Sequence, residues 1–178
     1  MPDPLRVAVV TGANRGLGLE VSRQLAHLGY RVVLGSRDLA KGAQAAATLA
    51  EAGLDVTPVE LDVTEPATLT RLAGRLEAEA GHVDVLVNNA AIHYDSWQQA
   101  TAADLDVVRE AIETNLIGAW QATLALLQLI RSSGHGRIAN VSSGAGALED
   151  MGGGAPRLQG LQHLAECPHA NVGGRVEA

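Results

Sequence analysis

Aromatic side chains are nearly absent from this chain. Its 178 residues include no Phe, two Trp and two Tyr, although hydrophobic residues make up 47% of the sequence. A chain of this length can bury a sizeable core in one domain. We therefore expect a core of aliphatic side chains, as in a parallel sheet that is covered on both faces by helices.

Cysteine is equally scarce, because Cys167 is the only one. The sequence therefore excludes a disulfide framework and a cysteine-based metal site, and its six histidines show no ligand spacing, so we expect no metal. It also lacks an apolar run of membrane-spanning length and a signal-peptide pattern. These features favour a reducing, cytoplasmic location.

Basic residues are fewer than acidic ones. The chain has 13 Lys and Arg residues and 20 Asp and Glu residues, which gives a net charge of −7, and the basic residues are scattered along the chain. Nucleic acids and anionic membranes are therefore poor candidate partners. A small molecule is the better expectation for a ligand.

Strand-like and helix-like patterns alternate along the chain. Strands are expected at 7–10, 31–34, 55–61, 83–87 and 136–141, and helices at 17–28, 39–52, 65–80 and 104–132. The last helix is either continuous or broken near Gly118. This order predicts an α/β fold with a doubly wound parallel sheet and right-handed crossovers.

A glycine-rich turn follows the first expected strand, where residues 11–18 read Thr-Gly-Ala-Asn-Arg-Gly-Leu-Gly. Gly12, Gly16 and Gly18 suit a sharp turn, a close approach of the backbone to a phosphate, and close packing of a helix on a strand. The free N–H groups of the next helix would attract an anion, and a pyrophosphate is the natural occupant. A turn without any ligand is the alternative.

Four more polar or glycine-containing segments also follow expected strands: 35–38, 62–63, 88–91 and 142–143. Because the carboxyl ends of parallel strands meet at one rim, we expect all five segments to lie together. The ligand should then lie where the first and fourth strands diverge.

The residues after the second strand bear on the type of dinucleotide. An acidic residue there would bind a ribose 2′-hydroxyl, but the sequence has Ser36 and Arg37, and Arg15 lies in the glycine loop. Two guanidinium groups could bracket a 2′-phosphate, which favours NADP. Asp38 keeps NAD as the less favoured cofactor, and the alternative for both arginines is a solvated surface position.

These residues make the chain resemble the short-chain dehydrogenase/reductase family, and within it the carbonyl-reductase-like group, over residues 5 to about 156. The resemblance implies a Rossmann fold and a pyrophosphate site formed by Thr11, Gly12, Asn14, Arg15, Gly16, Leu17 and Gly18. It implies that Asp62 and Val63 contact adenine. It also implies that 88–90 stabilise the central strand and border the cofactor, with Ala91 where the family usually has Gly.

The same resemblance implies two catalytic residues. Asn115 matches the helix asparagine that supports a proton-relay water, and Ser143 matches the serine that binds the substrate carbonyl, with Ser142 as the alternative. The implied substrate is a carbonyl compound or alcohol. The oligomeric state is left open, since family members often form dimers or tetramers through the helix that contains Asn115.

One part of the family pattern is missing. The family's proton donor is a tyrosine followed four residues later by a lysine, about a dozen residues beyond the serine. This chain has only Tyr30 and Tyr94, both upstream, and its only lysine is Lys41. We therefore expect an oxidoreductase lineage with little or no turnover in this form; a non-catalytic NADP(H)-binding module and a non-functional gene product are the alternatives.

The tail after Pro156 has poor periodicity, and Pro168 and two glycines would interrupt a helix. We therefore divide the chain into an incomplete NAD(P)-binding domain over 1–150 and an irregular tail over 151–178. The codons of 157–177 can be chosen so that a frame shifted by one base encodes a tyrosine and an amphipathic helix. The tail is thus interpreted as out of frame, and a naturally truncated tail is the alternative.

This interpretation predicts that the fifth strand forms a sheet edge and that residues after about 150 are disordered. It also predicts an uncovered apolar stripe and a marginal, aggregation-prone chain. The stripe is expected to consist of Leu116, Leu124, Leu127 and Ile130.

Overall fold

A computed structural model describes residues 5–92 and 100–143 of the chain. The elements follow in the order β1 (Arg6–Val10), α1 (Gly16–His27), β2 (Tyr30–Ser36), α2 (Leu39–Glu51), β3 (Val56–Glu60), α3 (Pro66–Glu79), β4 (Val85–Asn88), the 3₁₀ turn η1 (Ala100–Ala102), α4 (Leu105–Ile112), the π-helix η2 (Glu113–Gly118), α5 (Ala119–Ser132) and β5 (Arg137–Asn140). The predicted tail lies outside the described residues.

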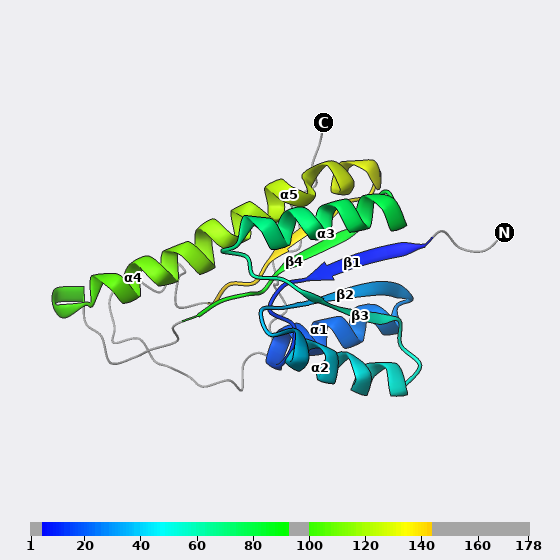
Figure 1. Ribbon diagram of the computed structural model, residues 1–178, viewed down its shortest axis with the longest axis horizontal. Coiled ribbons are helices and arrows are strands. Elements are labelled where there is room, and N and C mark those ends of the chain that lie inside the picture. The colour runs from blue at the N-terminus through cyan, green and yellow to red at the C-terminus, as the bar shows by residue number, and fades with distance from the viewer. Residues whose placement is uncertain (1–4, 93–99, 144–178) are drawn as a thin grey trace.

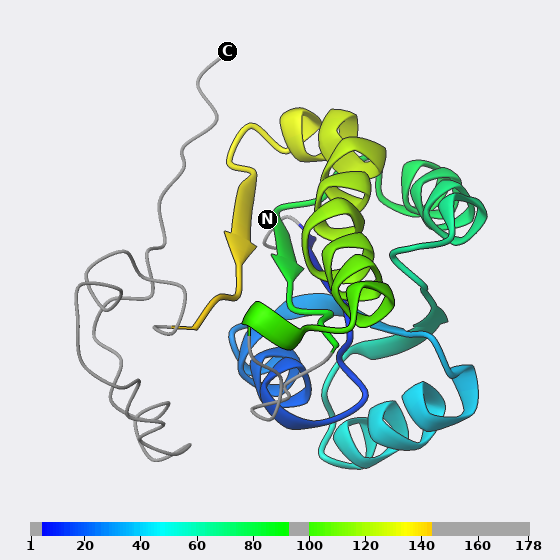
Figure 2. The same cartoon turned by 90° about the vertical axis from the view of Figure 1, so that its left-hand side faces the viewer.

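The five strands form one parallel sheet in the order β3-β2-β1-β4-β5. Helices α1 and α2 cover one face, and α3 and α5 cover the other (Figures 1 and 2). The chain winds outward from β1 to β3 and then returns to β4 on the other side of β1, so the direction reverses between β1 and β4. The predicted doubly wound sheet is confirmed, with its switch point where the sequence placed the ligand.

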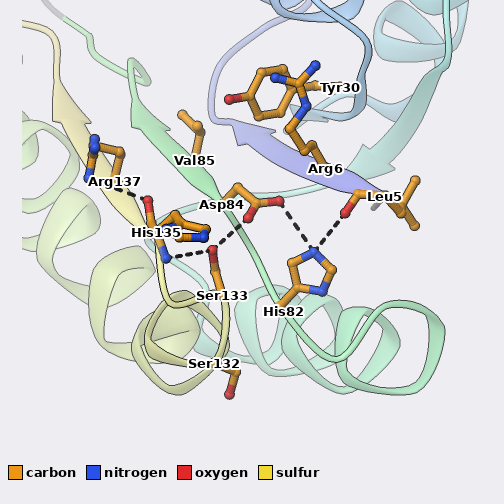
Figure 3. Close-up of a pocket in the computed structure, with 10 residues that line it drawn as sticks. All are labelled: Leu5, Arg6, Tyr30, His82, Asp84, Val85, Ser132, Ser133, His135 and Arg137. Atoms are coloured by element: carbon orange, nitrogen blue, oxygen red, sulfur yellow. Dashed lines mark hydrogen bonds and ion pairs between the residues drawn. The ribbon is translucent and has the colours of Figure 1, made fainter. Parts of the chain in front are cut away.

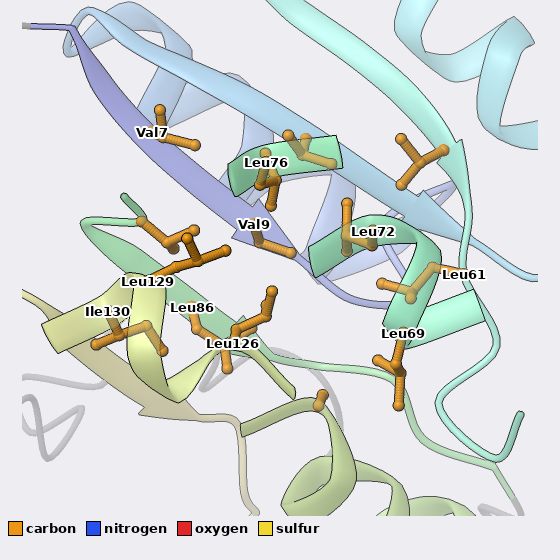
Figure 4. Packing of buried hydrophobic residues seen from close by; sticks show 14 of the residues in the cluster. Val7, Val9, Leu61, Leu69, Leu72, Leu76, Leu86, Leu126, Leu129 and Ile130 are labelled. Atoms are coloured by element: carbon orange, nitrogen blue, oxygen red, sulfur yellow. The ribbon is translucent and has the colours of Figure 1, made fainter. Parts of the chain in front are cut away.

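The core is aliphatic on both faces of the sheet, as predicted. Along β1, Val7 and Val9 pack toward α3 and α5, whereas Ala8 and Val10 pack toward α1 and α2. All four side chains are fully buried, because a central parallel strand is covered on both faces. Figure 4 shows the larger cluster, in which β1 and β4 meet leucines from α3 and α5.

Local residues explain where helix α2 begins and ends. The Asp38 carboxylate accepts a hydrogen bond from the Lys41 backbone N–H at 3.1 Å, which caps the amino end. Ala52 and then Gly53, with a φ of +76°, follow the helix. This backbone conformation is disfavoured for residues with a side chain, so the helix ends there.

Helices α4 and α5 are joined by η2, and the three elements form one long rod that extends past the sheet (Figure 1). The expected break near Gly118 is therefore a π-helical stretch over Glu113–Gly118 within a continuous rod. No residue of α4 is buried among the described residues.

The predicted apolar stripe on this rod is partly wrong. Leu116 and Leu124 are each 59% exposed, as expected for an uncovered stripe, and Trp120 joins them at 61%. Ile130, however, is 1% exposed and packs in the core. It lies one helical turn after the buried Leu126, on the side of α5 that faces the sheet.

The predicted start of the fourth strand is also wrong. The apolar pattern places Val83 in this strand, but β4 begins at Val85. The Val83 N–H donates to the carbonyl of Leu129 in α5 at 3.0 Å, so its hydrogen bond goes to a helix end and not to a neighbouring strand. Val83 is fully buried all the same, and burial is what the apolar pattern had detected.

Candidate cofactor and active site

Thr11, at the carboxyl end of β1, joins this strand to the segment that follows β4. Its side chain is buried, and its hydroxyl oxygen accepts the backbone N–H groups of Asn89 and Ala90, each at 3.0 Å. Its own N–H donates to the carbonyl of Val87 at 3.0 Å. Thr11 therefore holds the two segments together at the switch point, and its hydroxyl is buried between them.

The glycine loop packs closely against the same segment. The Asn89 side-chain amide donates to the carbonyls of Thr11 at 2.9 Å and Gly12 at 3.1 Å. A Cβ atom on Gly12 would lie 2.7 Å from the Ala90 Cα, and one on Gly18 would lie 2.4 Å from the Asn89 amide nitrogen. Two of the three glycines are thus required by packing within the protein.

Gly16 differs from these two glycines. Its φ is +57°, and a Cβ atom there would meet nothing within 4 Å. It begins α1, whose amino end has no side-chain cap and no acidic residue in its first turn. By contrast, Asp38 caps α2 and Asp104 caps α4, whereas α3 also lacks a side-chain cap but begins with Pro66, which has no N–H to offer. Open space and uncapped N–H groups at the start of α1 suit a phosphate, so the site fits a pyrophosphate.

At the end of β2, one side chain is buried, and the two that follow it are exposed. Ser36 is buried, and its hydroxyl donates to the Asp38 carbonyl at 2.8 Å. Arg37 is exposed. The Asp38 carboxylate is engaged locally, since it caps α2 and lies 3.2 Å from the Lys41 ammonium group. The backbone N–H of Lys41 and then its side chain lower the pKa of Asp38.

The end of β3 turns into α3 through a local network. The Asp62 carboxylate accepts hydrogen bonds from the N–H and hydroxyl of Thr64 at 2.9 and 2.7 Å. Val63 is 3% exposed and packs beside Gly118, where an added Cβ would approach its side chain to 2.5 Å. Val63 therefore touches the π-helix that contains Asn115.

Asn115 holds the segment after β4 by two hydrogen bonds. Its side-chain oxygen accepts the Ile92 N–H at 2.9 Å, and its side-chain nitrogen donates to the Ile92 carbonyl at 3.1 Å. The side chain projects from η2, and π-helical stretches of this kind occur often at functional sites. The contact brings the predicted catalytic asparagine to the same rim as the glycine loop.

Ser143 lies beyond β5, which is held at this rim by Asn88. The Val141 N–H donates to the Asn88 carbonyl at 2.9 Å, and the Asn88 side chain donates to Asn140 at 2.8 Å and to Thr123 at 3.1 Å. Ser142 and Ser143 are exposed. Sequence reasoning missed Asn140, Thr123 and Ile92, because their partners lie 52, 35 and 23 residues away in the chain.

The remaining predicted residues also lie on or near this rim: Asn14 is half-buried, Arg15 and Ala91 are exposed, and Leu17 is 40% exposed. Within 5–92 and 100–143, no group of three His, Cys, Asp or Glu side chains could hold a metal ion. None of the helices described there is both long and apolar enough to cross a membrane.

A hollow of about 460 Å³ lies away from this rim, at the amino ends of the strands (Figure 3). Its lining includes Arg6 from β1, Tyr30 from β2, His82 and Asp84 before β4, and Arg137 from β5. None of these residues belongs to the predicted site. The hollow and the predicted site therefore lie at opposite rims of the sheet.

Comparison with known proteins identifies the family. The family model described as short chain dehydrogenase matches residues 6–155. The chain belongs to the short-chain dehydrogenase family. The glycine loop, Asn115 and Ser143 all fall within the part of the chain that this family model matches.

Named relatives come from plants and bacteria. The short-chain dehydrogenase/reductase 1 of Saponaria officinalis is 38% identical over 172 residues, which cover 83% of this chain and 56% of the relative. The (+)-neomenthol dehydrogenase of Arabidopsis thaliana is 36% identical over 167 residues, covering 82% of this chain and 56% of the relative. The chain thus spans a little over half the length of these short-chain dehydrogenases.

Solved structures of the family share the fold. Salutaridine reductase from Papaver somniferum superposes with a TM-score of 0.73 at 32% identity, over 82% of this chain and 60% of the other. A metagenomic short-chain oxidoreductase in complex with NADP gives a TM-score of 0.71 at 31% identity, over 78% of this chain and 62% of the other. These values confirm the Rossmann-type architecture.

Proposed function

We propose that this chain is the cofactor-binding part of an NADP-dependent oxidoreductase that interconverts a small carbonyl compound and an alcohol. The observation that carries the proposal is the start of α1, where uncapped N–H groups adjoin the open space at Gly16. The pyrophosphate would lie over residues 11–18, and Asp62 and Val63 would border the adenine. The setting that we propose is the cytoplasm.

The selectivity for NADP rests on the end of β2. Arg37 and Arg15 are exposed, and no salt bridge involves either of them within the described part of the chain. Asp38, the residue that could favour NAD, is already used as the cap of α2. Two free guanidinium groups and an engaged carboxylate favour binding of a 2′-phosphate.

The chemistry would take place at the ends of β4 and β5. Bound NADPH supplies the hydride. In this chain, Ser143 would donate its hydroxyl hydrogen bond to the substrate carbonyl. Asn115 would keep residues 91–92 in place beside the cofactor through its two bonds to Ile92. Asn89 and Ala90 would form the floor under the cofactor, since both pack on the glycine loop.

No tyrosine lies at this rim within the described residues to supply the proton that the product alcohol requires. Of the two tyrosines, Tyr30 lies at the amino end of β2, on the opposite rim, and Tyr94 lies outside the described residues. We therefore propose that the 178-residue chain binds NADPH with little or no turnover. A non-catalytic NADP(H)-binding subunit is the alternative function.

The test is a titration of the full chain with NADPH and NADH, followed by nicotinamide fluorescence, together with an assay of NADPH oxidation with ketone and aldehyde substrates. We expect saturable binding that is tighter for NADPH, and oxidation at the rate of the protein-free control. Binding of neither nucleotide would overturn the proposal. Rapid carbonyl-dependent oxidation would refute the proposed lack of turnover.

A further inference from the structure

His82 lies in the hollow at the amino rim, and the three polar groups in contact with its ring among the described residues are all hydrogen-bond acceptors. Nδ1 lies 2.9 Å from the Ala80 carbonyl oxygen, and Nε2 lies 2.9 Å from the Leu5 carbonyl oxygen. A carboxylate oxygen of Asp84 lies 3.3 Å from the same Nε2 (Figure 3). The three acceptors come from the end of α3, the start of β1 and the start of β4.

This geometry selects the protonation state of the ring. Neutral imidazole has one N–H donor and one acceptor nitrogen, so one nitrogen would direct its lone pair at a carbonyl oxygen. The imidazolium ion has two N–H groups and satisfies both contacts. The side chain of Asp84, only 14% exposed, supplies the matching negative charge.

Asp84 is fixed in turn by other donors. One carboxylate oxygen accepts the Val7 N–H of β1 at 2.7 Å, and the other accepts the Ser133 hydroxyl at 2.6 Å. In a hydrolytic triad the serine hydroxyl bonds to the histidine, and the histidine bonds to the aspartate. Here the Ser133 hydroxyl donates to Asp84 and makes no recorded bond to His82, so the cluster is not a hydrolytic triad. Its consequence is structural: it joins β1, β4 and the end of α5.

We propose that protonated His82 is a pH-sensitive clamp, which holds the amino ends of β1 and β4 against the end of α3 and opens when the ring loses its proton. The clamp is independent of the proposed cofactor site, which lies at the other end of the same strands.

Other charged and titratable groups lie near His82, and most of those in β1 and α3 have partners of their own. Arg6 of β1 stacks its guanidinium over the Tyr30 ring, 4.5 Å from the centroid, and donates to the Leu28 carbonyl. In α3, Glu79 pairs with Arg75 at 2.7 Å. The lining of the hollow also contains the titratable group of His135 and the cation of Arg137.

The balance of these contacts sets the direction of the pH dependence. Burial lowers the pKa of His82, but the carbonyls of Ala80 and Leu5 and the Asp84 carboxylate outweigh it and raise the pKa above its ordinary value. A histidine whose pKa is higher in the folded chain than in the unfolded chain stabilises the fold fully below about pH 6.5. That stabilisation is lost as the pH rises through the folded-state pKa.

The direct test is an NMR titration of the histidine rings in the ¹⁵N-labelled full chain, with the His82 signal assigned by its loss in His82→Gln. We expect both ring nitrogens of His82 to carry protons at pH 6.5, with a titration midpoint above that value. A midpoint at or below 6.5, or a neutral ring at pH 6, would overturn the proposal. The titration itself is followed in the wild-type chain, and the His82→Gln variant serves only to assign the signal.

The second test compares thermal unfolding at pH 5.5 and pH 8.5 for the wild type, His82→Gln and the matched variant His135→Gln. His135 lines the same hollow, and its recorded hydrogen bonds involve only its backbone. On raising the pH, we expect the melting temperature of the wild type and of His135→Gln to fall by at least about 2 °C more than that of His82→Gln. Equal pH responses in all three chains would refute the clamp.

Discussion

The two rims of the sheet use their polar groups in opposite ways. At the amino rim, the Asp84 carboxylate contacts His82, Ser133 and the Val7 N–H of β1, and the His82 ring also contacts the Leu5 carbonyl. At the carboxyl rim, the start of α1 has no side-chain cap, and Arg15 and Arg37 are exposed without an ion pair within the described residues.

The difference follows from what each rim must do. Polar groups that satisfy one another inside the protein add stability, because an unpaired buried group would cost free energy. Polar groups that are left uncapped are available for a ligand instead. Even at the carboxyl rim, the hydroxyl of Thr11 and the amide of Asn89 are used internally, and they support the loop that would hold the ligand.

The largest expected effect on stability comes from adding a methyl group where the glycine loop packs against the segment after β4. In Gly12→Ala, the new Cβ would combine a φ of +62° with a 2.7 Å approach to the Ala90 Cα. We expect a loss of about 3 kcal/mol in the free energy of unfolding, measured by urea denaturation, together with loss of NADPH binding.

The matched control is Gly53→Ala, where φ is +76° but the added Cβ meets nothing within 4 Å. This variant should lose only about 1 kcal/mol, from backbone strain alone, and keep its nucleotide affinity. Equal losses in the two variants would show that contact with Ala90 is unimportant.

At the amino rim, Asp84→Ala should weaken the fold without affecting nucleotide binding. The change leaves the Val7 N–H and the Ser133 hydroxyl without their acceptor, at a cost of about 2 kcal/mol in the free energy of unfolding. The comparison variant is Asp55→Ala, which breaks only the exposed pair with Arg31 and should cost under about 0.5 kcal/mol. A parallel loss of NADPH affinity in Asp84→Ala would show that the rims are coupled.

The smallest effect on stability, and the most selective effect on binding, is expected for Arg37→Ala. Removing one charge-assisted contact with a 2′-phosphate should weaken NADPH binding by about tenfold and leave NADH binding and stability unchanged. The control is Arg71→Ala, which removes an exposed arginine paired with Glu60 at 3.5 Å. If Arg37→Ala weakens NADH and NADPH equally, the assignment of the arginine to the 2′-phosphate is wrong.

Much of the fold could be predicted from local patterns. The valines of β1 and the spacing of apolar residues in α3 reflect burial, and burial is periodic in the sequence. The carboxyl rim was predictable because parallel strands share one direction, so segments 11–18, 62–63 and 88–91 had to meet there. The roles of individual residues at this rim remain predictions.

Other features depend on partners that are distant in the chain. The sequence predicted a helix over 104–132 and flagged Gly118, but η2 is π-helical where Gly118 packs on Val63 and Asn115 bonds to Ile92. From the sequence, Asp38 keeps NAD as the less favoured cofactor, and only the structure shows that its carboxylate caps α2.

By itself, the sequence determined the aliphatic core, the order of strands and helices, and the place of the glycine loop after the first strand. These depend on side-chain polarity and backbone preference, which act over a few residues. Only the tertiary structure decided the second partner of the His82 ring, since the carbonyl of Leu5, 77 residues away in the chain, reaches Nε2 only after β1 and β4 pair. A protonation state depends on all the groups that surround the ring in space, and folding brings those groups together.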